Sequence, residues 1–364
     1  MEFSKIKVAI VHDWLTNYGG AERVVEAFLE IFPNADIYTS VYNEKNMGQI
    51  FPKEKIKTTF LQKLPKATKI YTKLLPLMPR AFERFDLSEY DLVISSSSSC
   101  AKGVITSHNT VHISYIHSPM RYAWDLYYDY YKNSGRLTKI FMELFMPKIR
   151  QWDVLNTTRI DHLLANSNYV SKRIKKYYRR DSDVIYPPVN TEFFYPNDKE
   201  AEDFYVVFSR FVSYKRIDLA IKACNQLEKK LIVIGDGEQR EYLKSIAGEK
   251  TEFTGRISDE EVRDYLQRCK AMIFSAEEDF GIVPVEVQAC GRPVIAYGKG
   301  GAKETVVDGV TGVHFGEQSV ESLEEAIKRF ESLKLKQENI LENAKIFSKE
   351  RFKEEILEKI KMVL

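Results

Sequence analysis

Two glutamates stand out in the segment Glu278–Glu286, where seven residues separate them. We expect a loop to carry Glu278 and a helix beginning at Pro284 to carry Glu286. The backbone amides of Phe280–Val283 would then lie at the helix N-terminus, where unpaired N–H groups and the helix dipole attract phosphate. Ionised carboxylates accept hydrogen bonds from hydroxyls, so the segment favours a nucleotide-sugar site. The alternative is a solvated loop charge at Glu278 and a dipole-offsetting charge at Glu286.

A second candidate pair, Arg210 and Lys215, follows the predicted strand Phe204–Phe208. A forked guanidinium and an ammonium five residues apart suit a diphosphate held from two sides. They would stabilise negative charge on a departing nucleoside diphosphate. A solvated basic loop in front of a helix is the alternative.

Two further candidates follow predicted strands of the first half. Gly19-Gly20 precedes a helix, and its small residues allow a close approach to a diphosphate or sugar; a structural turn is the alternative. His117 follows the strand Val111–Ile116. A zinc site with His108 and His112 is rejected, because alternation puts His112 and His117 on opposite faces and no acidic or thiol ligand follows. Ser95–Ser99 fits a polar ligand-lining loop or a low-complexity linker.

Two other patterns carry less weight. Gly235-Asp-Gly237 resembles a dinucleotide fingerprint, but Arg240 stands where a third glycine is needed. Asp181-Ser-Asp183 has the spacing of a metal-binding triplet, yet it precedes a strand, at the wrong end for a ligand site. We therefore expect no divalent metal, with Arg210 and Lys215 supplying the positive charge.

Length and composition predict a globular protein of two domains. The 364 residues exceed one ordinary core, and 44% are hydrophobic and 29% charged. Four cysteines without CxxC spacing fit reduced thiols in a cytosolic protein. We expect neither a signal peptide nor a membrane-spanning segment.

Charge is distributed unevenly along the chain. Residues 1–195 carry 27 Lys and Arg against 20 Asp and Glu, whereas the remainder carries 27 against 32. The segment Lys53–Arg84 has nine basic and two acidic residues, interleaved with Leu and aromatic side chains. It suits contact with an anionic membrane surface, or an ordinary amphipathic helix pair whose apolar face is core. We find no nucleic-acid-binding motif and expect no nucleic acid partner.

Two successive series of alternating strands and helices must position these side chains. The first runs from Lys7 to Ala165, the proline-bounded segment Tyr186–Pro196 reads as a linker, and the second begins at Phe204. The pattern predicts an α/β protein with two doubly wound parallel sheets. Ligands of such sheets bind at the carboxyl ends of the strands, which predicts a site in the cleft between the domains.

Taken in order, these motifs resemble retaining glycosyltransferases of family 4, which have the GT-B fold of two Rossmann-like domains. The likeness covers almost the whole chain and includes Thr254-Gly-Arg256 and Gly300-Gly301…Asp308-Gly-Val-Thr-Gly312. It implies an acceptor-binding domain, residues 1–190 with a final helix 347–364 crossing back. A donor-binding domain, residues 191–346, would follow.

The resemblance also implies residue roles. Arg210, Lys215, Glu278 and His117 would be the catalytic set. Donor contacts would come from Gly19, Gly20, Gly235, Arg256, Ile257, Phe280, Gly281, Ile282, Val283 and Glu286. Glu278 and the amides of Phe280–Val283 would hold the sugar and phosphate, Glu286 the ribose, and Arg256-Ile257 would border the base.

Two stretches, from His12 to Arg23 and from His117 to Asp125, are similar to mannosyltransferases of bacterial O-antigen and polysaccharide assembly. That similarity implies GDP-mannose as donor and a polyprenyl-diphosphate-linked glycan as acceptor. It implies a cytoplasmic enzyme, peripheral on the inner face of the cell membrane. Rivals are a UDP-sugar transferase of the same fold, an epimerase and a non-catalytic glycan or membrane adaptor; a dehydrogenase fits least.

Overall fold

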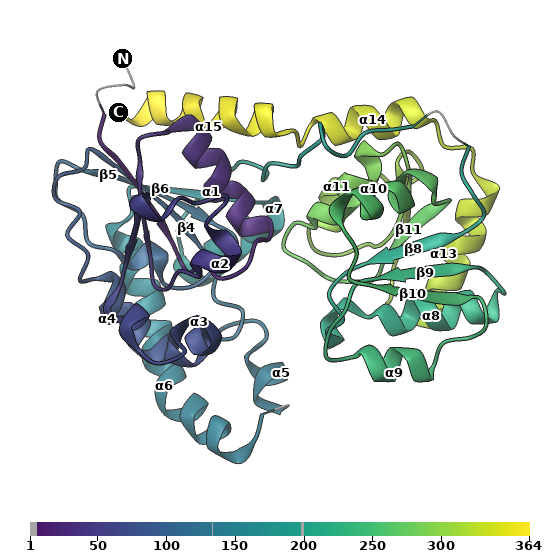
Figure 1. Cartoon of the computed structure of the whole chain (residues 1–364), viewed down its shortest axis with the longest axis horizontal. Helices are drawn as coiled ribbons and strands as arrows, with labels where there is room; N and C mark the ends of the chain where they lie inside the picture. The colour runs from purple at the N-terminus through teal and green to yellow at the C-terminus, as the bar shows by residue number, and fades with distance from the viewer. Residues whose placement is uncertain (1–5, 133, 198–199) are drawn as a thin grey trace. The chain divides into compact units, whose positions relative to one another are not determined.

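The computed structural model describes residues 6–132, 134–197 and 200–364 (Figure 1). Its contacts divide the chain into two compact units. Unit 1 comprises Met1–Pro187 and Phe352–Leu364, and unit 2 comprises Pro188–Arg351. The first division falls within the proline-bounded segment that the sequence predicts as a linker, and the second falls inside the last helix.

Unit 1 is built on a seven-stranded parallel sheet in the order β3-β2-β1-β4-β5-β6-β7. Its strands are β1 (Val8–His12), β2 (Asp36–Thr39), β3 (Ile56–Thr58), β4 (Leu92–Ser97), β5 (Val111–Ile116), β6 (His162–Ala165) and β7 (Asp183–Val184). Its helices are α1 (Gly20–Ile31), α2 (Glu44–Met47), α3 (Ala67–Ile70), α4 (Met78–Phe82), α5 (Tyr127–Lys132), α6 (Arg136–Leu155), α7 (Asn168–Tyr178) and most of α15 (Lys349–Val363). Short 3₁₀ turns are η2 (Lys53–Lys55), η3 (Phe60–Lys63), η4 (Tyr71–Leu77), η5 (Ala101–Gly103) and η6 (Asn156–Arg159).

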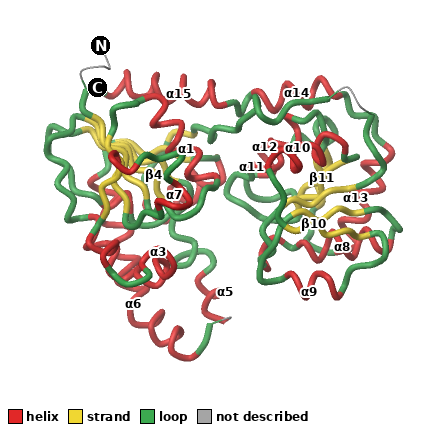
Figure 2. The backbone as a smooth tube through the Cα atoms, viewed as in Figure 1, coloured by secondary structure: helices red, strands yellow, loops and turns green. Residues whose placement is uncertain are grey.

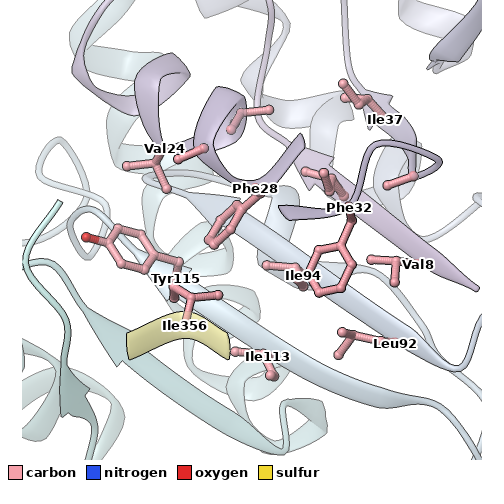
Figure 3. Packing of buried hydrophobic residues seen from close by; sticks show 14 of the residues in the cluster. Val8, Val24, Phe28, Phe32, Ile37, Leu92, Ile94, Ile113, Tyr115 and Ile356 are labelled. Carbon is pink, nitrogen blue, oxygen red and sulfur yellow. The ribbon is translucent and has the colours of Figure 1, made fainter. Parts of the chain in front are cut away.

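Both faces of this sheet are buried. Successive side chains of β1 alternate between two apolar clusters, because strand residues point to opposite faces. One cluster lies against α1 and α15: Phe28 points towards Tyr115, and Ile356 of α15 lies beside them (Figure 3). The ring of Phe352 is 5.6 Å from that of Phe28. The last helix is therefore part of the unit 1 core.

The opposite face packs against α4, α6 and the short helices of the segment Lys53–Arg84. In that segment Leu61, Met78 and Phe82 are fully buried, and most of its remaining apolar side chains are partly buried against the same cluster. The apolar face is core, as in the alternative, but the segment forms strand β3 and short helical turns rather than the expected helix pair. The segment exposes basic side chains but few apolar ones.

Unit 2 is a six-stranded parallel sheet in the order β10-β9-β8-β11-β12-β13. Its strands are β8 (Tyr205–Phe208), β9 (Leu231–Ile234), β10 (Thr251–Gly255), β11 (Ala271–Phe274), β12 (Val294–Tyr297) and β13 (Gly312–Phe315). Its helices are η7 (Ser213–Lys215), α8 (Ile217–Gln226), α9 (Arg240–Ser245), α10 (Asp259–Arg268), α11 (Ile282–Ala289), α12 (Ala302–Thr305), α13 (Val320–Ser332) and α14 (Gln337–Lys345). The strands lie between α8 and α9 on one side and α10 and α11 on the other (Figure 2).

The sequence-based elements differ from the structure in a few places. Helix α11 begins at Ile282 rather than at Pro284. Helix α6 continues through Pro147, which is exposed. Strands β3 and β13 were not predicted; both are short and lie at the sheet edges, where few neighbours constrain the pattern.

Candidate active site

The first candidate site lies in unit 2, where β8 and β11 are neighbours at the centre of the sheet. Connections leave β8 towards β9 on one side, whereas β11 continues to β12 on the other, so this is the topological switch point. Ligands of open α/β sheets bind outside the carboxyl ends of the strands at such a point. The loops that follow β8 and β11 carry Arg210, Lys215 and Glu278 to this edge.

Lys215 and Glu278 form an ion pair across the switch point. Their side chains are 16% and 20% exposed, so the pair is partly shielded from solvent. Arg210 lies in the same loop as Lys215 and is exposed. An anionic ligand at this edge could draw Lys215 from Glu278 and leave the carboxylate to accept hydrogen bonds from hydroxyls. The structure thus brings together three of the four residues predicted as catalytic.

The loop after β11 leads into α11 through Gly281, which has a left-handed backbone with φ of 85°. Because α11 begins at Ile282, the amides of Ile282 and Val283 belong to its first turn, where backbone donors have no partner within the helix. Phe280 is buried beside Phe347, with ring centroids 5.5 Å apart. The predicted donor segment is therefore an anchored loop at a helix N-terminus.

Glu286 lies on the second turn of α11 and is 1% exposed. A charge that only offsets the helix dipole is normally solvated, so this burial disagrees with the alternative drawn from the sequence. Burial of a carboxylate is costly unless it is hydrogen-bonded or paired. Glu286 is consequently part of the buried interior of unit 2 rather than a solvated surface charge.

Glycines allow the two site loops to pack tightly. A Cβ atom on Gly235, whose φ is 132°, would lie 1.9 Å from the carbonyl oxygen of Ser209, and one on Gly237 would lie 2.5 Å from that of Phe211. The loop after β9 therefore supports the loop that carries Arg210. Gly301 likewise packs against Phe280, where a Cβ would come within 2.3 Å of its Cα atom. Close packing and a positive φ thus explain why glycine occupies position 235, which the sequence did not reveal.

The predicted base-bordering residues lie elsewhere on the same edge. Arg256 and Ile257 follow β10, two strands from β8, and Arg256 is exposed. A pocket lined by residues of β8 and β11 and by Lys215 has only about 10 Å³ of free volume. This pocket is too small to hold a nucleotide.

The second candidate site lies in unit 1 at the equivalent switch point, where β1 and β4 are neighbours. His12 ends β1, and its Nδ1 is 3.1 Å from both the carbonyl and the hydroxyl oxygen of Ser96. Its Nε2 is 3.4 Å from Glu22 on α1. The Ser96 hydroxyl is in turn 2.7 Å from Nε2 of His117. These four side chains form one connected polar cluster.

The pKa values of the two histidines of this cluster shift in opposite directions. Burial by itself lowers the pKa of His12, but the hydrogen bond and charge of Glu22 more than offset it and the pKa is raised. Burial, together with neighbouring His12, lowers the pKa of His117 to about 3. His117 is therefore neutral at physiological pH, and its imidazole can donate one hydrogen bond and accept another.

Gly19 and Gly20 are close to this cluster. Gly19 is the N-cap of α1 and Gly20 its first residue. A Cβ on Gly19 would lie 3.3 Å from a carboxylate oxygen of Glu22, so a side chain there would crowd the cluster. Arg23 donates its amide to the Gly19 carbonyl, which fixes the turn.

The serine run ends strand β4 with Ser95–Ser97 and continues as an ordered loop around Asp13, so it is not a linker. The backbone amides of Ser98, Ser99, Cys100 and Ala101 donate to the Asp13 carboxylate at 2.7–2.9 Å. Asp13 is 2% exposed, so these donors replace water. The interpretation as a low-complexity linker is wrong, because long-range hydrogen bonds hold the run.

A buried ion pair fastens the same loop to α6. Lys102 and Asp153 are 1% and 0% exposed. Lys102 also donates to the Ser99 carbonyl at 2.6 Å, and Asp153 accepts from Trp124 at 2.7 Å and from Tyr178 at 3.0 Å. This network has no sequence signal, because its members are scattered along the chain.

The histidines considered for zinc are used otherwise. Nε2 of His112 is 2.9 Å from the hydroxyl of Ser95, and burial lowers the pKa of His112 to about 4. Asp181 and Asp183 are exposed and pair with Lys175 and Lys359. Across the described residues, His, Cys, Asp and Glu side chains form no group of three with metal-ligand geometry. Independence from metal stays a prediction.

The sequence analysis assigned no role to His12, Asp13 or Glu22. Their signal is their position: His12 ends the first strand, Asp13 directly follows it, and Glu22 lies in the first turn of the helix that follows the glycine pair. Polar residues directly after a buried strand of a parallel sheet lie at its ligand-binding edge. The same rule that selected His117 could have found them.

Comparison with known proteins gives the family. Two family models match consecutive parts of the chain: Glycosyltransferase Family 4 at residues 18–193 and Glycosyl transferases group 1 at residues 189–347. An uncharacterised glycosyltransferase of Methanocaldococcus jannaschii is 30% identical over 198 residues, 53% of this chain and 56% of that protein. The alpha-1,3/1,6-mannosyltransferase ALG2 of Saccharomyces cerevisiae is 26% identical over 384 residues, 86% of this chain and 73% of that protein.

A solved structure supports the fold. HepE of Anabaena in complex with UDP and glucose has a TM-score of 0.70 at 17% identity, and the match covers 98% of this chain and 99% of that one. The chain spans little more than half the length of the Methanocaldococcus relative. The two parallel-sheet units, the two family models and the GT-B neighbour agree, and the protein belongs to the family 4-like glycosyltransferases of the GT-B fold.

Proposed function

We propose that this protein transfers a hexose, mannose from GDP-mannose as the first candidate, to a lipid-linked glycan with retention of configuration. The observation that carries the proposal is the meeting of Lys215, Glu278 and the N-terminus of α11 at the switch point of unit 2. An ammonium and a helix N-terminus suit the diphosphate, and a carboxylate beside them suits the sugar hydroxyls.

Retention requires the acceptor hydroxyl to arrive on the face from which the diphosphate leaves. The bond from the anomeric carbon to the phosphate oxygen breaks through an oxocarbenium-like state, and the acceptor oxygen bonds to that carbon. The departing phosphate oxygen takes the acceptor proton. Arg210, Lys215 and the α11 amides stabilise the charge on this phosphate, so no metal is required.

The N-terminal residues have a separate part in the proposal. Neutral His117 can hydrogen-bond a sugar hydroxyl, and Gly19 and Gly20 leave room for a ligand close to the backbone. That these residues contact the same donor as Lys215 involves both units and stays a prediction. Glu286 as the ribose partner and Arg256 with Ile257 beside the base also stay predictions.

The choice of donor has two candidates. The likeness of two segments to bacterial mannosyltransferases and the mannosyltransferase name of the yeast relative favour GDP-mannose. The complex of HepE with UDP and glucose favours a UDP-sugar as the second candidate. A polyprenyl-diphosphate-linked acceptor and work at the inner face of the membrane belong to the same proposal. In the described parts of the chain, no helix combines the length and apolarity needed to cross a bilayer.

The test is turnover of GDP-mannose, UDP-glucose and UDP-N-acetylglucosamine, each with and without a polyprenyl-diphosphate-linked acceptor. We expect GDP-mannose to be consumed only with acceptor, in the presence of EDTA, and the new linkage to have the donor's anomeric configuration by NMR. Exclusive use of a UDP-sugar would replace GDP-mannose as the assigned donor. Altered free sugar nucleotide without acceptor would indicate an epimerase. Absence of turnover and of donor-induced thermal stabilisation would favour the adaptor.

A further inference from the structure

The first half of helix α6 is apolar on two faces. Its inner face, with Met142, Met146 and Ile149, is buried in the unit 1 core. A second set, the outer stripe, consists of Leu137, Ile140, Leu144 and Phe145. Its members follow the spacing i, i+3, i+7, i+8 of one helical face. Leu137 and Leu144 are 84% and 64% exposed, which is unusual for large apolar residues at regular spacing.

The helix that precedes α6 adds exposed aromatic residues. Tyr128 and Tyr130 of α5 are 70% and 52% exposed. Tyrosine side chains are common at the boundary between water and lipid, because the ring is apolar and the hydroxyl is polar. Helices α5 and α6 extend together from the body of unit 1 (Figure 1).

Basic residues flank the outer stripe at its two ends, while exposed Glu143 lies next to Leu144. Arg136 precedes it, and Lys148 continues it four residues after Leu144; both are exposed. The segment Lys53–Arg84 packs on the same apolar cluster as α6. A 3.0 Å hydrogen bond from Trp152 of α6 to Glu83 links the two. That segment exposes Lys63, Lys66, Lys69, Lys73, Arg80 and Arg84. Exposed apolar residues on α6, and exposed lysines and arginines on a segment packed on the same cluster, match the chemistry of an anionic bilayer surface.

We propose that α5 and the outer stripe of α6 insert into the surface of an anionic bilayer, while the basic side chains of the adjoining segment contact lipid headgroups. The proposal rests on the proposed function insofar as a lipid-linked acceptor places the enzyme at a membrane. The sequence assigned the whole membrane contact to the segment Lys53–Arg84. In the present proposal that segment supplies only the basic side chains, and α6 supplies the apolar ones.

The test measures binding of the full-length protein to vesicles by co-sedimentation. Vesicles of phosphatidylglycerol with phosphatidylcholine are compared with phosphatidylcholine alone. We expect binding to the anionic vesicles, weakened by high salt. The double variant Leu137→Gln with Leu144→Gln should bind at least about tenfold more weakly, since two leucines no longer leave water. Lys66→Glu with Lys69→Glu should also weaken binding.

The matched control is Met362→Gln, which changes a residue that is 78% exposed on α15, outside the stripe. It should bind vesicles like the natural protein. Turnover of the nucleotide sugar with the lipid-linked acceptor dispersed in detergent, without vesicles, should be unchanged in the leucine variant, which separates failure of membrane binding from failure of the proposed function.

Three outcomes would overturn the proposal. The first is equal vesicle binding by the leucine variant and the natural protein. The second is a lower unfolding temperature of the leucine variant, which would mean that another part of the chain covers the stripe. The third is a dimer of the natural protein that the leucine variant dissociates in sedimentation velocity, which would assign the stripe to a second copy.

Discussion

The two units place polar side chains at the same topological position but treat them in opposite ways. In unit 1, His12, Asp13 and Ser96 are buried and hydrogen-bonded to one another or to backbone. In unit 2, Arg210 is exposed, and Lys215 and Glu278 pair in a partly open position. These polar groups of unit 1 are thus set before any ligand arrives, whereas Lys215 and Glu278 of unit 2 can exchange partners.

This difference predicts where a substitution should be felt. A buried polar network is costly to break, because the remaining partner is left without water or a hydrogen bond. A partly exposed pair contributes less to stability than a fully buried one, but it can contribute much to a charged transition state. Substitutions in unit 1 should therefore change stability first, and substitutions in unit 2 should change activity first.

The largest effect is expected from Asp153→Ala, which leaves buried Lys102 without its carboxylate. The free energy of unfolding should fall by about 3–5 kcal/mol, measured by denaturant unfolding. The combined variant Lys102→Met with Asp153→Leu should recover most of this loss, since it removes both charges. As control, Glu252→Ala breaks the exposed pair with Lys230 and should cost less than about 1 kcal/mol. Equal costs for the two alanine variants would contradict the comparison.

The next effect is expected from Lys215→Ala in unit 2. If Lys215 stabilises the leaving diphosphate, kcat should fall by about 10²-fold, or about 2.7 kcal/mol in the barrier. The unfolding temperature should change little, because only a partly exposed ion pair is lost. Lys222→Ala is the matched control, since Lys222 is an exposed lysine on the neighbouring helix α8. Unchanged turnover of Lys215→Ala would remove Lys215 from the site.

The third effect concerns pH and the buried histidines of unit 1. Below pH 6.5 the unfolded chain binds a proton at His112, whereas the folded protein resists it down to about pH 4. Stability should therefore decrease as pH falls through this window, by about 3 kcal/mol at most from His112. His12 acts in the opposite direction, because its raised pKa stabilises the fold at low pH and this contribution is lost as pH rises.

The variant His112→Gln isolates the first of these contributions. Its unfolding free energy, measured between pH 7 and pH 4, should fall less steeply than that of the natural protein. Any cost of losing the hydrogen bond to Ser95 should be independent of pH and should shift the whole curve. Parallel curves for the two proteins would show that His112 does not titrate on unfolding.

Much of the architecture could be predicted because it follows local pattern. Strand β5 has the bounds expected from the sequence, Val111–Ile116. Ser167 caps α7 through its hydroxyl, as its position before the helix predicts. The rule that ligands bind at the carboxyl ends of parallel strands selected Arg210, Lys215 and Glu278, and the structure brings these residues to one edge.

Local pattern could not distinguish an apolar face that is core from one that is exposed. The segment Lys53–Arg84 and the first half of α6 both carry apolar residues at helical spacing, yet the former packs into the core and the latter leaves Leu137 and Leu144 in solvent. Periodicity reports that a face is apolar, and the identity of its partner depends on elements distant in the sequence.

The sequence by itself determined the two α/β units, the family and the residues at the carboxyl edge of unit 2, because these depend on short-range spacing. Only the tertiary structure decided which polar residues are buried and what they pair with. Asp13 meets the amides of Ser98–Ala101, and Lys102 meets Asp153, because β1, the loop after β4 and α6 fold together. Desolvation and hydrogen bonding set the free-energy cost of burying these groups and their protonation states. Both desolvation and hydrogen bonding depend on neighbours that lie far apart in the sequence.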